Sequence, residues 1–494
     1  MSAFLPSSAL GLPASLDYKL PPSLSDDSKA YWVNVAPDAI NTVAANGLQI
    51  FSGTVGASQS NAFNSQLVTF TIPSGTSRSV FLDPRETTLN FRLAIQVSIA
   101  PAGGAGVTHN LISSAQSFFD SLILYSNNIP IEQINGYNIL ANQLLAATVN
   151  SAEKYGGCAV AMGCDINSNT GVDLNVLTTA AGYYYWNFSI PLISVIGLNN
   201  HDRLFPVGSI NNLQLQMQTA SLLPFSSYNT TACTTTGVMN VSLDYFSLNM
   251  KYIDIGMDSA RMLSSTLADG KIFMKTQTWI QSAVNVPTGT LGQSNLLYQI
   301  RNSSLKSVLI QNSQSTSLVC PNGLYDAVNL SATQFNVSVG GMAYPQRPLN
   351  PSIKPAEAFL AYMSALGYSG DYKKYGGIIT RSAYGASTAT TTLGTQNGYD
   401  SSIVVPATGV RAESSIVTGT TQIVSQFPNM HYLGVDFEKS CGLLFNGLNT
   451  RASPPVANFY FNTATLAAST SFCFGLVDCV LVIDTMAQTI AAYV

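Results

Sequence analysis

Residues 89–99 read Leu-Asn-Phe-Arg-Leu-Ala-Ile-Gln-Val-Ser-Ile, and this stretch sets the expectation for the fold. Large apolar side chains occupy every second position from Leu89 to Ile99, with polar or small residues between them. A period of two is the pattern of a β-strand that buries one face and exposes the other. Residues 213–218 and 334–339 alternate in the same way. Many such strands, separated by Gly, Asn, Ser and Pro, predict an all-β protein of the sandwich or jelly-roll type.

The alternation slips by one residue near Tyr245. Leu243 and Tyr245 continue one series of apolar positions, whereas Phe246 and Leu248 begin another on the opposite parity. One extra residue in a strand is a β-bulge, which is common where barrels and sandwiches bend. The sequence therefore predicts a bulge at this point.

Two segments have helical spacing. Residues 137–150 place apolar side chains on one helical face, and Asn135 is the expected N-cap. Residues 355–366 do the same, with Pro355 suited to the first turn and Gly367 to the stop. The two faces consist of Tyr137, Leu140, Leu144, Leu145 and Thr148 in the first helix, and of Phe359, Tyr362, Met363 and Leu366 in the second.

The order of these segments indicates one plan that is repeated in the two halves of the chain: strands, a helix, and further strands. Strands precede the helix at 137–150 and follow it to about Ile255; strands from about residue 271 precede the helix at 355–366 and follow it to Ile483. The join is expected within Gly256–Gly270. A length of 494 residues suits two packing units, since one domain usually has roughly 100–200 residues. Residues 1–45, rich in Pro, Ser, Ala and Leu, belong to neither half; they suit an arm laid across a neighbouring subunit, or an ordinary frayed terminus.

The chain carries unusually little charge. Lys and Arg number 21 against 25 Asp and Glu, so the formal net charge is −4 and gives no basic footprint for nucleic acid. Charged residues make up 9% of the chain, compared with roughly 25% in a typical soluble domain. An uncharged polar surface is poorly protected against self-association. This composition favours a protein that binds copies of itself.

No segment reads as a membrane span or a secretory signal. The most apolar stretch, 472–483, contains Asp478 and is too short, so it predicts a strand buried on both faces. The N-terminal residues have no basic region and are interrupted by four prolines at positions 6, 13, 21 and 22. The six Asn-x-Ser/Thr sequons (Asn187, Asn229, Asn240, Asn302, Asn329 and Asn336) then follow from composition alone.

Groups that carry catalysis are scarce. The three histidines, at positions 109, 201 and 431, are isolated in sequence, and no metalloprotease, phosphate-loop or nucleophile-elbow motif is present. Ser-x-x-Lys occurs at 151–154 and 303–306, as expected by chance in a Ser-rich chain. The segment 201–203, His-Asp-Arg, reads as a surface cluster in a loop, and the basic-aromatic patch at 372–375 is too small for a nucleic-acid groove.

Carboxylates and cysteines likewise predict no site. Asp254 with Asp258, and Asp478 with Asp484, are neighbours only in sequence and are expected to cap strand ends. The seven cysteines, at positions 158, 164, 233, 320, 441, 473 and 479, have no zinc-site spacing and are expected to be free thiols. We therefore predict no catalytic, cofactor-binding or metal-binding residues, and a building block rather than an enzyme.

Several segments resemble double jelly-roll major capsid proteins, most closely those of polinton-like viruses and virophages. More distant kin are the capsid proteins of large nucleocytoplasmic DNA viruses and adenovirus hexon. The likeness runs in order over roughly residues 60–490, although each motif alone is weak. It rests on residues 117–125 (SFFDSLILY), 128–140 (NIPIEQINGYNIL), 186–192 (WNFSIPL), 204–208 (LFPVG), 213–217 (LQLQM), 335–341 (FNVSVGG), 344–350 (YPQRPLN) and 445–451 (FNGLNTR).

The resemblance implies two tandem eight-stranded jelly-roll barrels with short helical insertions, at 46–256 and 257–494, after an extended arm at 1–45. It also implies homotrimeric, pseudo-hexameric capsomers that tile the icosahedral shell of a double-stranded DNA virus, assembled inside the host cell. Neighbouring capsomers, penton proteins and minor or cement proteins would be the partners, without sequence-specific nucleic-acid binding; an inner membrane stays open. The family has no catalytic residues to transfer.

Three other classes of protein remain open from the residues alone. A carbohydrate-binding β-sandwich has mild support from the sequons and 23 tyrosines but lacks a signal peptide. A single jelly-roll shell domain with a projecting domain usually has a basic N-terminal arm, whereas residues 1–45 contain only Lys19 and Lys29 as basic residues. A β-rich hydrolase lacks a nucleophile with its base.

Overall fold

The structure is a computed structural model of the 494-residue chain. It describes residues 27–40, 48–55, 66–75, 77–97, 107–111, 114–149, 157–163, 182–200, 203–220, 225–229, 237–266, 270–314, 327, 329–368, 379, 384, 414–416, 423–425, 430–439, 446–462 and 468–493.

Strands dominate both halves of the chain. The first half contains β1 (Lys29–Val35), β2 (Ala39–Ile40), β3 (Leu48–Val55), β4 (Leu67–Ile72), β5 (Val80–Val97), β6 (Val107–Leu111), β7 (Phe119–Ser126), β8 (Ile129–Asn135), α1 (Tyr137–Thr148), α3 (Gly157–Met162), β9 (Gly182–Pro191), β10 (Leu213–Thr219), β11 (Phe225–Asn229) and β12 (Gly237–Asp254). After α4 (Met257–Thr266), the second half contains β13 (Lys271–Val286), β14 (Gly292–Leu297), β15 (Leu305–Gln314), β16 (Gln334–Val339), β17 (Met342–Leu349), α5 (Pro355–Ala365), β18 (Ser414–Ile416), β19 (Ile423–Ser425), β20 (Tyr432–Asp436), β21 (Val456–Phe461), β22 (Ser469–Asp484) and β23 (Thr489–Tyr493).

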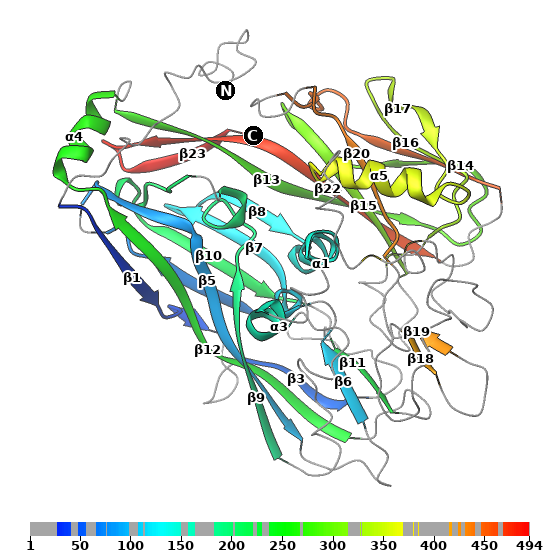
Figure 1. Cartoon of the computed structure of the whole chain (residues 1–494), viewed down its shortest axis with the longest axis horizontal. Helices are drawn as coiled ribbons and strands as arrows, with labels where there is room; N and C mark the ends of the chain where they lie inside the picture. Colours follow the sequence, from blue (N-terminus) through cyan, green and yellow to red (C-terminus); the bar gives the residue numbers. More distant parts are fainter. Residues whose placement is uncertain are drawn as a thin grey trace.

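Each half is a sandwich of two antiparallel sheets (Figure 1). In the first half, one sheet has the order β1-β12-β5-β9, with β3 also paired to β12, and the other has the order β2-β4-β10-β7-β8. In the second half, the sheets run β13-β22-β15-β20, with β23 paired to β22, and β14-β21-β16-β17. This arrangement confirms the all-β, double jelly-roll fold.

The two halves match strand by strand. Replacing β1, β12, β5 and β9 by β13, β22, β15 and β20 reproduces one sheet order, and β4, β10, β7 and β8 correspond in the same way to β14, β21, β16 and β17. A helix follows the last strand of the second set in both halves, α1 after β8 and α5 after β17. A later loop returns to pair with the start of a long strand in both, as bridges Leu82–Phe205 and Leu305–Leu448. The expectation of one plan executed twice is therefore confirmed in the topology.

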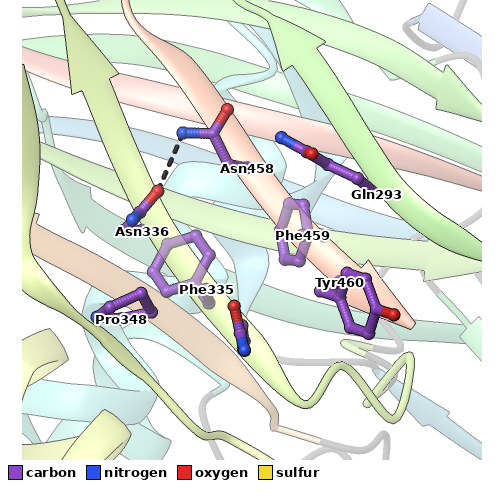
Figure 2. A pocket seen from close by; sticks show the side chains of 8 residues that line it. Gln293, Phe335, Asn336, Pro348, Asn458, Phe459 and Tyr460 are labelled. Carbon is purple, nitrogen blue, oxygen red and sulfur yellow. Dashed lines mark hydrogen bonds between the residues drawn. The ribbon is translucent and has the colours of Figure 1, made fainter. Parts of the chain in front are cut away.

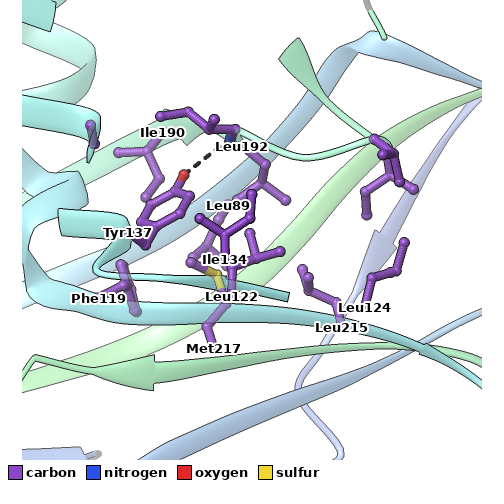
Figure 3. Packing of buried hydrophobic residues seen from close by; sticks show 14 of the residues in the cluster. Leu89, Phe119, Leu122, Leu124, Ile134, Tyr137, Ile190, Leu192, Leu215 and Met217 are labelled. Carbon is purple, nitrogen blue, oxygen red and sulfur yellow. Dashed lines mark hydrogen bonds between the residues drawn. The ribbon is translucent and has the colours of Figure 1, made fainter. Parts of the chain in front are cut away.

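The strands have the burial that their alternation predicts. Leu89, Phe91 and Leu93 of β5 are buried, and so are the apolar residues of β10 and β16. The ring of Phe91 contacts four other phenylalanine rings, with centroids 5.4–6.1 Å apart, at positions 118, 119, 188 and 246. Figure 3 shows the neighbouring part of this core, where Tyr137 packs near Phe119 and Ile190. The Tyr137 hydroxyl accepts a hydrogen bond from the backbone N–H of Ile193 (3.1 Å).

Both helices form where expected, but one cap differs. The N-cap of α1 is Gly136, in the left-handed region at φ 58°, and no side chain caps this helix; the expectation for Asn135 was wrong. Asn135 is still the last residue of β8, and the chain turns into the helix through the glycine. At the end of α5, Gly367 has φ 81° and its N–H donates to the carbonyl of Ser364 (2.8 Å), while Tyr368 donates to Met363 (3.0 Å). This is a Schellman motif, and it confirms Gly367 as the stop.

The bulge in β12 is also confirmed. The register against β5 shifts between Asp244 and Ser247, and Tyr245 adopts a left-handed φ of 51°. This conformation turns Tyr245 outwards, away from the core that Leu243 and Phe246 enter, so the expectation that it shares the face of Leu243 was wrong.

Residues 29–40 were expected to lie outside both halves, and this was wrong. Lys29–Val35 pair with β12 along their whole length, and Ala39 and Ile40 pair with β4. Tyr31 and Val33 provide the physical reason, because their side chains pack against the first core through Tyr252 and its neighbours. Residues 1–26 and 41–47 lie outside the described part of the chain.

We predict that Phe91→Ala destabilises the first half by about 3–5 kcal/mol, because it removes the ring at the centre of the aromatic cluster and leaves a cavity. Tyr460→Ala, which truncates a half-exposed ring on the surface of β21, should cost less than about 1 kcal/mol. Urea unfolding followed by fluorescence measures both variants. Equal small effects would contradict the packing described here.

Candidate functional site: the interface between the halves and the exposed sheet faces

The described residues that could have carried catalysis are scattered or already paired. Ser303 and Lys306 form one of the two Ser-x-x-Lys patterns of the sequence. The Lys306 ammonium is bound by Glu438 (2.6 Å) and lies 3.7 Å from Asp478, so it is not a base for the serine. Asp254 accepts hydrogen bonds from Ser79 and from the N–H of Gly256, and Asp484 accepts from the N–H groups of residues 486 and 487. These two aspartates end strands, as predicted.

The other two aspartates do not cap strands. Asp478 lies in the middle of β22, fully buried, where it accepts a hydrogen bond from the Ser304 hydroxyl as well as facing Lys306. Asp258 lies in the first turn of α4 and pairs with Arg261 on the surface (3.7 Å). The strand-end expectation was therefore wrong for both, in Asp478 because its charged partner comes from β15, far away in sequence.

The remaining candidates give no site either. Residues 151–154, 201, 202 and 372–375 lie outside the described residues, and of His109 only the backbone is described. Cys473 and Cys479 are buried thiols whose pKa is raised by burial, so they are not reactive. Asn302 and Asn329 of the sequons are buried as well. Across the described ranges, no group of three or more His, Cys, Asp or Glu side chains could hold a metal ion. No helix in that part of the chain is long and apolar enough to cross a membrane.

A buried carboxylate marks the interface between the two halves. Glu132 of β8 is buried in the first half and accepts hydrogen bonds from the Ser194 hydroxyl, the Val195 N–H (2.9 Å) and the Asn199 amide (3.4 Å). Its fourth donor is the hydroxyl of Thr278 in β13 of the second half (2.8 Å). Burial raises the pKa of Glu132, and the four hydrogen bonds oppose that shift without cancelling it.

Helix α1 lies in the same interface. Its Asn142 amide donates to the hydroxyl of Tyr432 in β20 (3.4 Å), and the Tyr362 hydroxyl of α5 donates to the carbonyl of Gln143 (3.3 Å). One apolar cluster runs through the contact and contains side chains of both halves, including Trp279 and Phe474 of the second. The helix was expected to bury a single face; it buries its polar residues too, because the second half covers the other side (Figure 1).

A second polar group lies just beyond this contact. His431 is buried, its Nδ1 lies 2.8 Å from the carbonyl oxygen of Tyr384, and the Tyr384 hydroxyl donates to the carbonyl of Tyr432 (2.8 Å). Burial lowers the pKa of His431 to about 4, so the ring is neutral at pH 7. A neutral histidine that is hydrogen-bonded to a backbone carbonyl and packed against the Tyr384 ring (centroids 4.8 Å apart) is a structural group.

The sheet β14-β21-β16-β17 carries a hollow lined by polar and aromatic side chains without charge. The hollow has a volume of about 240 Å³. Among its lining side chains, the Asn458 amide donates to Asn336 Oδ1 (2.8 Å; Figure 2). The residues that line it are Gln293, Gln334, Phe335, Asn336, Pro348, Asn458, Phe459 and Tyr460. The matching strand of the first half, β10, presents Gln214, Gln216 and Gln218 on its outer face. Such faces offer hydrogen bonds to a neighbour but no group that transfers protons.

The outer face of the sheet β1-β12-β5-β9 carries one ion pair between aromatic rings. The Arg92 guanidinium makes two hydrogen bonds to Asp244, at 2.6 and 2.7 Å, and lies over the rings of Tyr185 and Tyr245 at 4.3 and 4.2 Å. Hydrogen bonding to Asp244 raises the pKa of Arg92. Neither this cluster nor the Glu132 site gives a local signal in the sequence, since the members of each are far apart in the chain.

Comparison with solved structures gives the same fold. No protein-family model matches the chain, and no curated protein matches its sequence. The chain is similar to the capsid of the virus PBCV-1 at 10% identity and a TM-score of 0.52, over 96% of this chain and 98% of that one. It is also similar to a chain of the Sputnik virophage at 11% identity and a TM-score of 0.50, over 96% and 90%. These likenesses confirm the resemblance to double jelly-roll capsid proteins at the level of the fold.

We predict that Glu132→Gln changes the pH dependence of stability. A carboxyl whose pKa is raised on folding favours the native state most when protonated, so its contribution falls as the pH rises above its unfolded value of about 4.5. The neutral glutamine lacks this loss. The wild type should therefore lose stability relative to the variant between pH 5 and pH 8, as measured by urea midpoints at both values. A pH-independent difference between the two proteins would contradict the raised pKa.

Proposed function

We propose that this chain is a structural, non-enzymatic major capsid protein of a double-stranded DNA virus. Three copies would form a capsomer whose six barrels make a pseudo-hexagonal tile, and the tiles would build an icosahedral capsid in the virion. The observation that carries the proposal is the strand-by-strand match between the two halves, joined with the likeness to the PBCV-1 capsid over nearly the whole of both chains. The proposed barrels are 46–256 and 257–494, with the first extended to include β1 and β2.

Two matching halves suit this role for a geometric reason. A closed oligomer repeats one contact around an axis, and a chain with two similar barrels presents six similar units in a threefold oligomer. Hexagonal tiles pack side by side without gaps over a flat facet. The alternatives fit less well, because a hydrolase needs a nucleophile–base pair, and the described residues bring none together.

The surface chemistry suits many weak lateral contacts. The hollow beside β21 and the outer face of β10 present amides and a tyrosine in place of charge, and the charges on the face of β5 and β12 are paired as Arg92 with Asp244. Each contact in a shell is repeated many times, so a modest buried area per contact is sufficient. We include neighbouring capsomers among the partners, and penton and minor or cement proteins at the edges of the tiles.

We predict a stable trimer in native mass spectrometry, at three times the chain mass of 52.4 kDa. Because salt screens charges and this chain has few, the trimer and the assembled tiles should persist with little change between about 0.05 and 1 M NaCl. A monomer would contradict the proposal and favour the carbohydrate-binding sandwich. Dissociation of the tiles at high salt would contradict the uncharged lateral contacts.

We also propose that the residues before β1 link neighbouring capsomers or reach minor proteins beneath the shell. Their apolar side chains, spaced between prolines, suit an extended segment that binds another surface. Deletion of residues 1–26 should leave the trimer intact and reduce the yield of closed shells, as judged by native mass and electron microscopy. Normal shells from the truncated chain would contradict a linking role.

A further inference from the structure

The contact between the two halves is head-to-tail. The first half contributes β8 and α1, from the end of its sandwich where the last strand turns into the helix. The second half contributes the opposite kind of edge, β13, together with residues of β20 and α5. Because the two halves use different surfaces, the equivalent surfaces remain exposed in one chain: the β1 edge of the first half, and in the second half the β17 end with the side of α5 that carries Leu360 rather than Tyr362.

We infer that the β1 edge of one copy docks on the β17–α5 end of a second copy, repeating the contact within the chain. The inference rests on the trimer proposed above and names the surfaces that would form it. Figure 1 places β1 and α5 on opposite sides of the molecule, as a head-to-tail contact between copies requires.

A pair of tryptophans identifies the β1 edge. The equivalent bridges at Leu82 and Leu305 align the two halves. Across the sheet from Leu82 lie Tyr252 and then Tyr31; across from Leu305 lie Val477 and then Thr278. The next residue along the edge strand is tryptophan in both halves, Trp32 in β1 and Trp279 in β13.

These equivalent tryptophans differ in exposure. Trp279 is only 6% exposed, in the apolar cluster that joins the halves, next to Thr278 and its hydrogen bond to Glu132. Two residues further on, Gln281 lies so close to the first half that a Cβ on Gly136 would be 2.4 Å from its amide nitrogen. Trp32 is 61% exposed in the single chain. A large aromatic side chain is a typical anchor of a protein interface, and the matching position already serves as one.

The opposite surface shows the same contrast. Counted from the first residue of each helix, the sixth residue is Asn142 in α1 and Leu360 in α5. Asn142 is buried and bonded to Tyr432 of the second half, whereas Leu360 is 50% exposed. Ile353, in the turn that leads into α5, is exposed as well. On the β1 edge, Trp32 and the neighbouring residues of β1 form what we call the β1 face. On the β17–α5 end, Ile353 and Leu360 form what we call the α5 face.

The test uses one charged substitution on each face of the full-length chain. Trp32→Glu and Leu360→Glu should each convert the trimer to a monomer, a threefold loss of native mass. Leu291→Glu, at a 62% exposed position in the turn between β13 and β14 and outside both faces, should remain trimeric. Circular dichroism and urea midpoints identify any variant that fails to fold. If Trp32→Glu does not fold, Trp32→Ser is tested in its place, and Leu360→Ser likewise replaces Leu360→Glu.

Mixing the two variants makes the test specific for a head-to-tail contact. Trp32→Glu keeps its α5 face and Leu360→Glu keeps its β1 face, so one intact contact remains in a mixed pair. Equimolar mixing should produce heterodimers that cannot close into a ring. If the wild type is trimeric but both variants stay trimeric, or if mixing yields only monomers, this inference is wrong while the capsomer stands. A monomeric wild type would instead overturn the proposed function itself.

Discussion

Burial of Glu132 between β8 and β13 holds the two halves in one relative position. Apolar side chains tolerate small shifts against one another, but a buried carboxylate must keep its donors or lose several kcal/mol. Three of its donors come from the loop after β9 and the fourth, Thr278, comes from the other half. Sliding β13 along β8 would break the Thr278 hydrogen bond, and so the tandem barrels behave as one unit. The geometry of any assembly built from this chain depends on that unit.

The same contact explains why α1 lacks a solvent-exposed face. Tyr137 holds the helix to the first half by its hydrogen bond to Ile193, and Asn142 reaches Tyr432 in the second. A helix between two sandwiches needs side chains that bond to both sides, and the Asn142 amide bonds to the second half without a charge. Charge is instead placed in a few closed pairs, such as Arg92 with Asp244 and Lys306 with Glu438. In these pairs each charge is neutralised by its partner, including the pair on the outer face of β5 and β12.

Local patterns were sufficient to predict the strands, the two helices and their repetition, because alternation and helical spacing are properties of short segments. The strand predicted over residues 89–97 and the slip near Tyr245 are examples; residues 98 and 99 of that stretch lie outside the described part of the chain. Contacts between distant segments were not predictable in this way. Asp478 was expected to end a strand, and only its position opposite Lys306 and Ser304 shows why a charge can lie inside β22. Glu132 gave no signal at all, since its donors are spread over residues 194–278.

The β1 strand was missed for a different reason. Its neighbours are rich in proline, and composition outweighed the short β-prone run from Tyr31 to Val35. The match of Trp32 with Trp279 becomes visible only after the two sheets are aligned by their pairing.

The two head-to-tail contacts cannot be chemically identical. β8 contributes a buried carboxylate to the contact within the chain, whereas β17, with the sequence Met-Ala-Tyr-Pro-Gln-Arg-Pro-Leu, contains none. A contact between copies at β17 therefore has no carboxylate to bury, and β17 offers it apolar side chains, neutral hydrogen bonds and the exposed Arg347, all of which a folded monomer can keep in water. The contact within the chain can include a buried carboxylate, because this contact forms as the chain folds and need not be reversible. Heterologous contacts close into a ring only if each one turns the next unit by the same angle. The contact that Glu132 fixes sets that angle, and the contact at β1 has to match it.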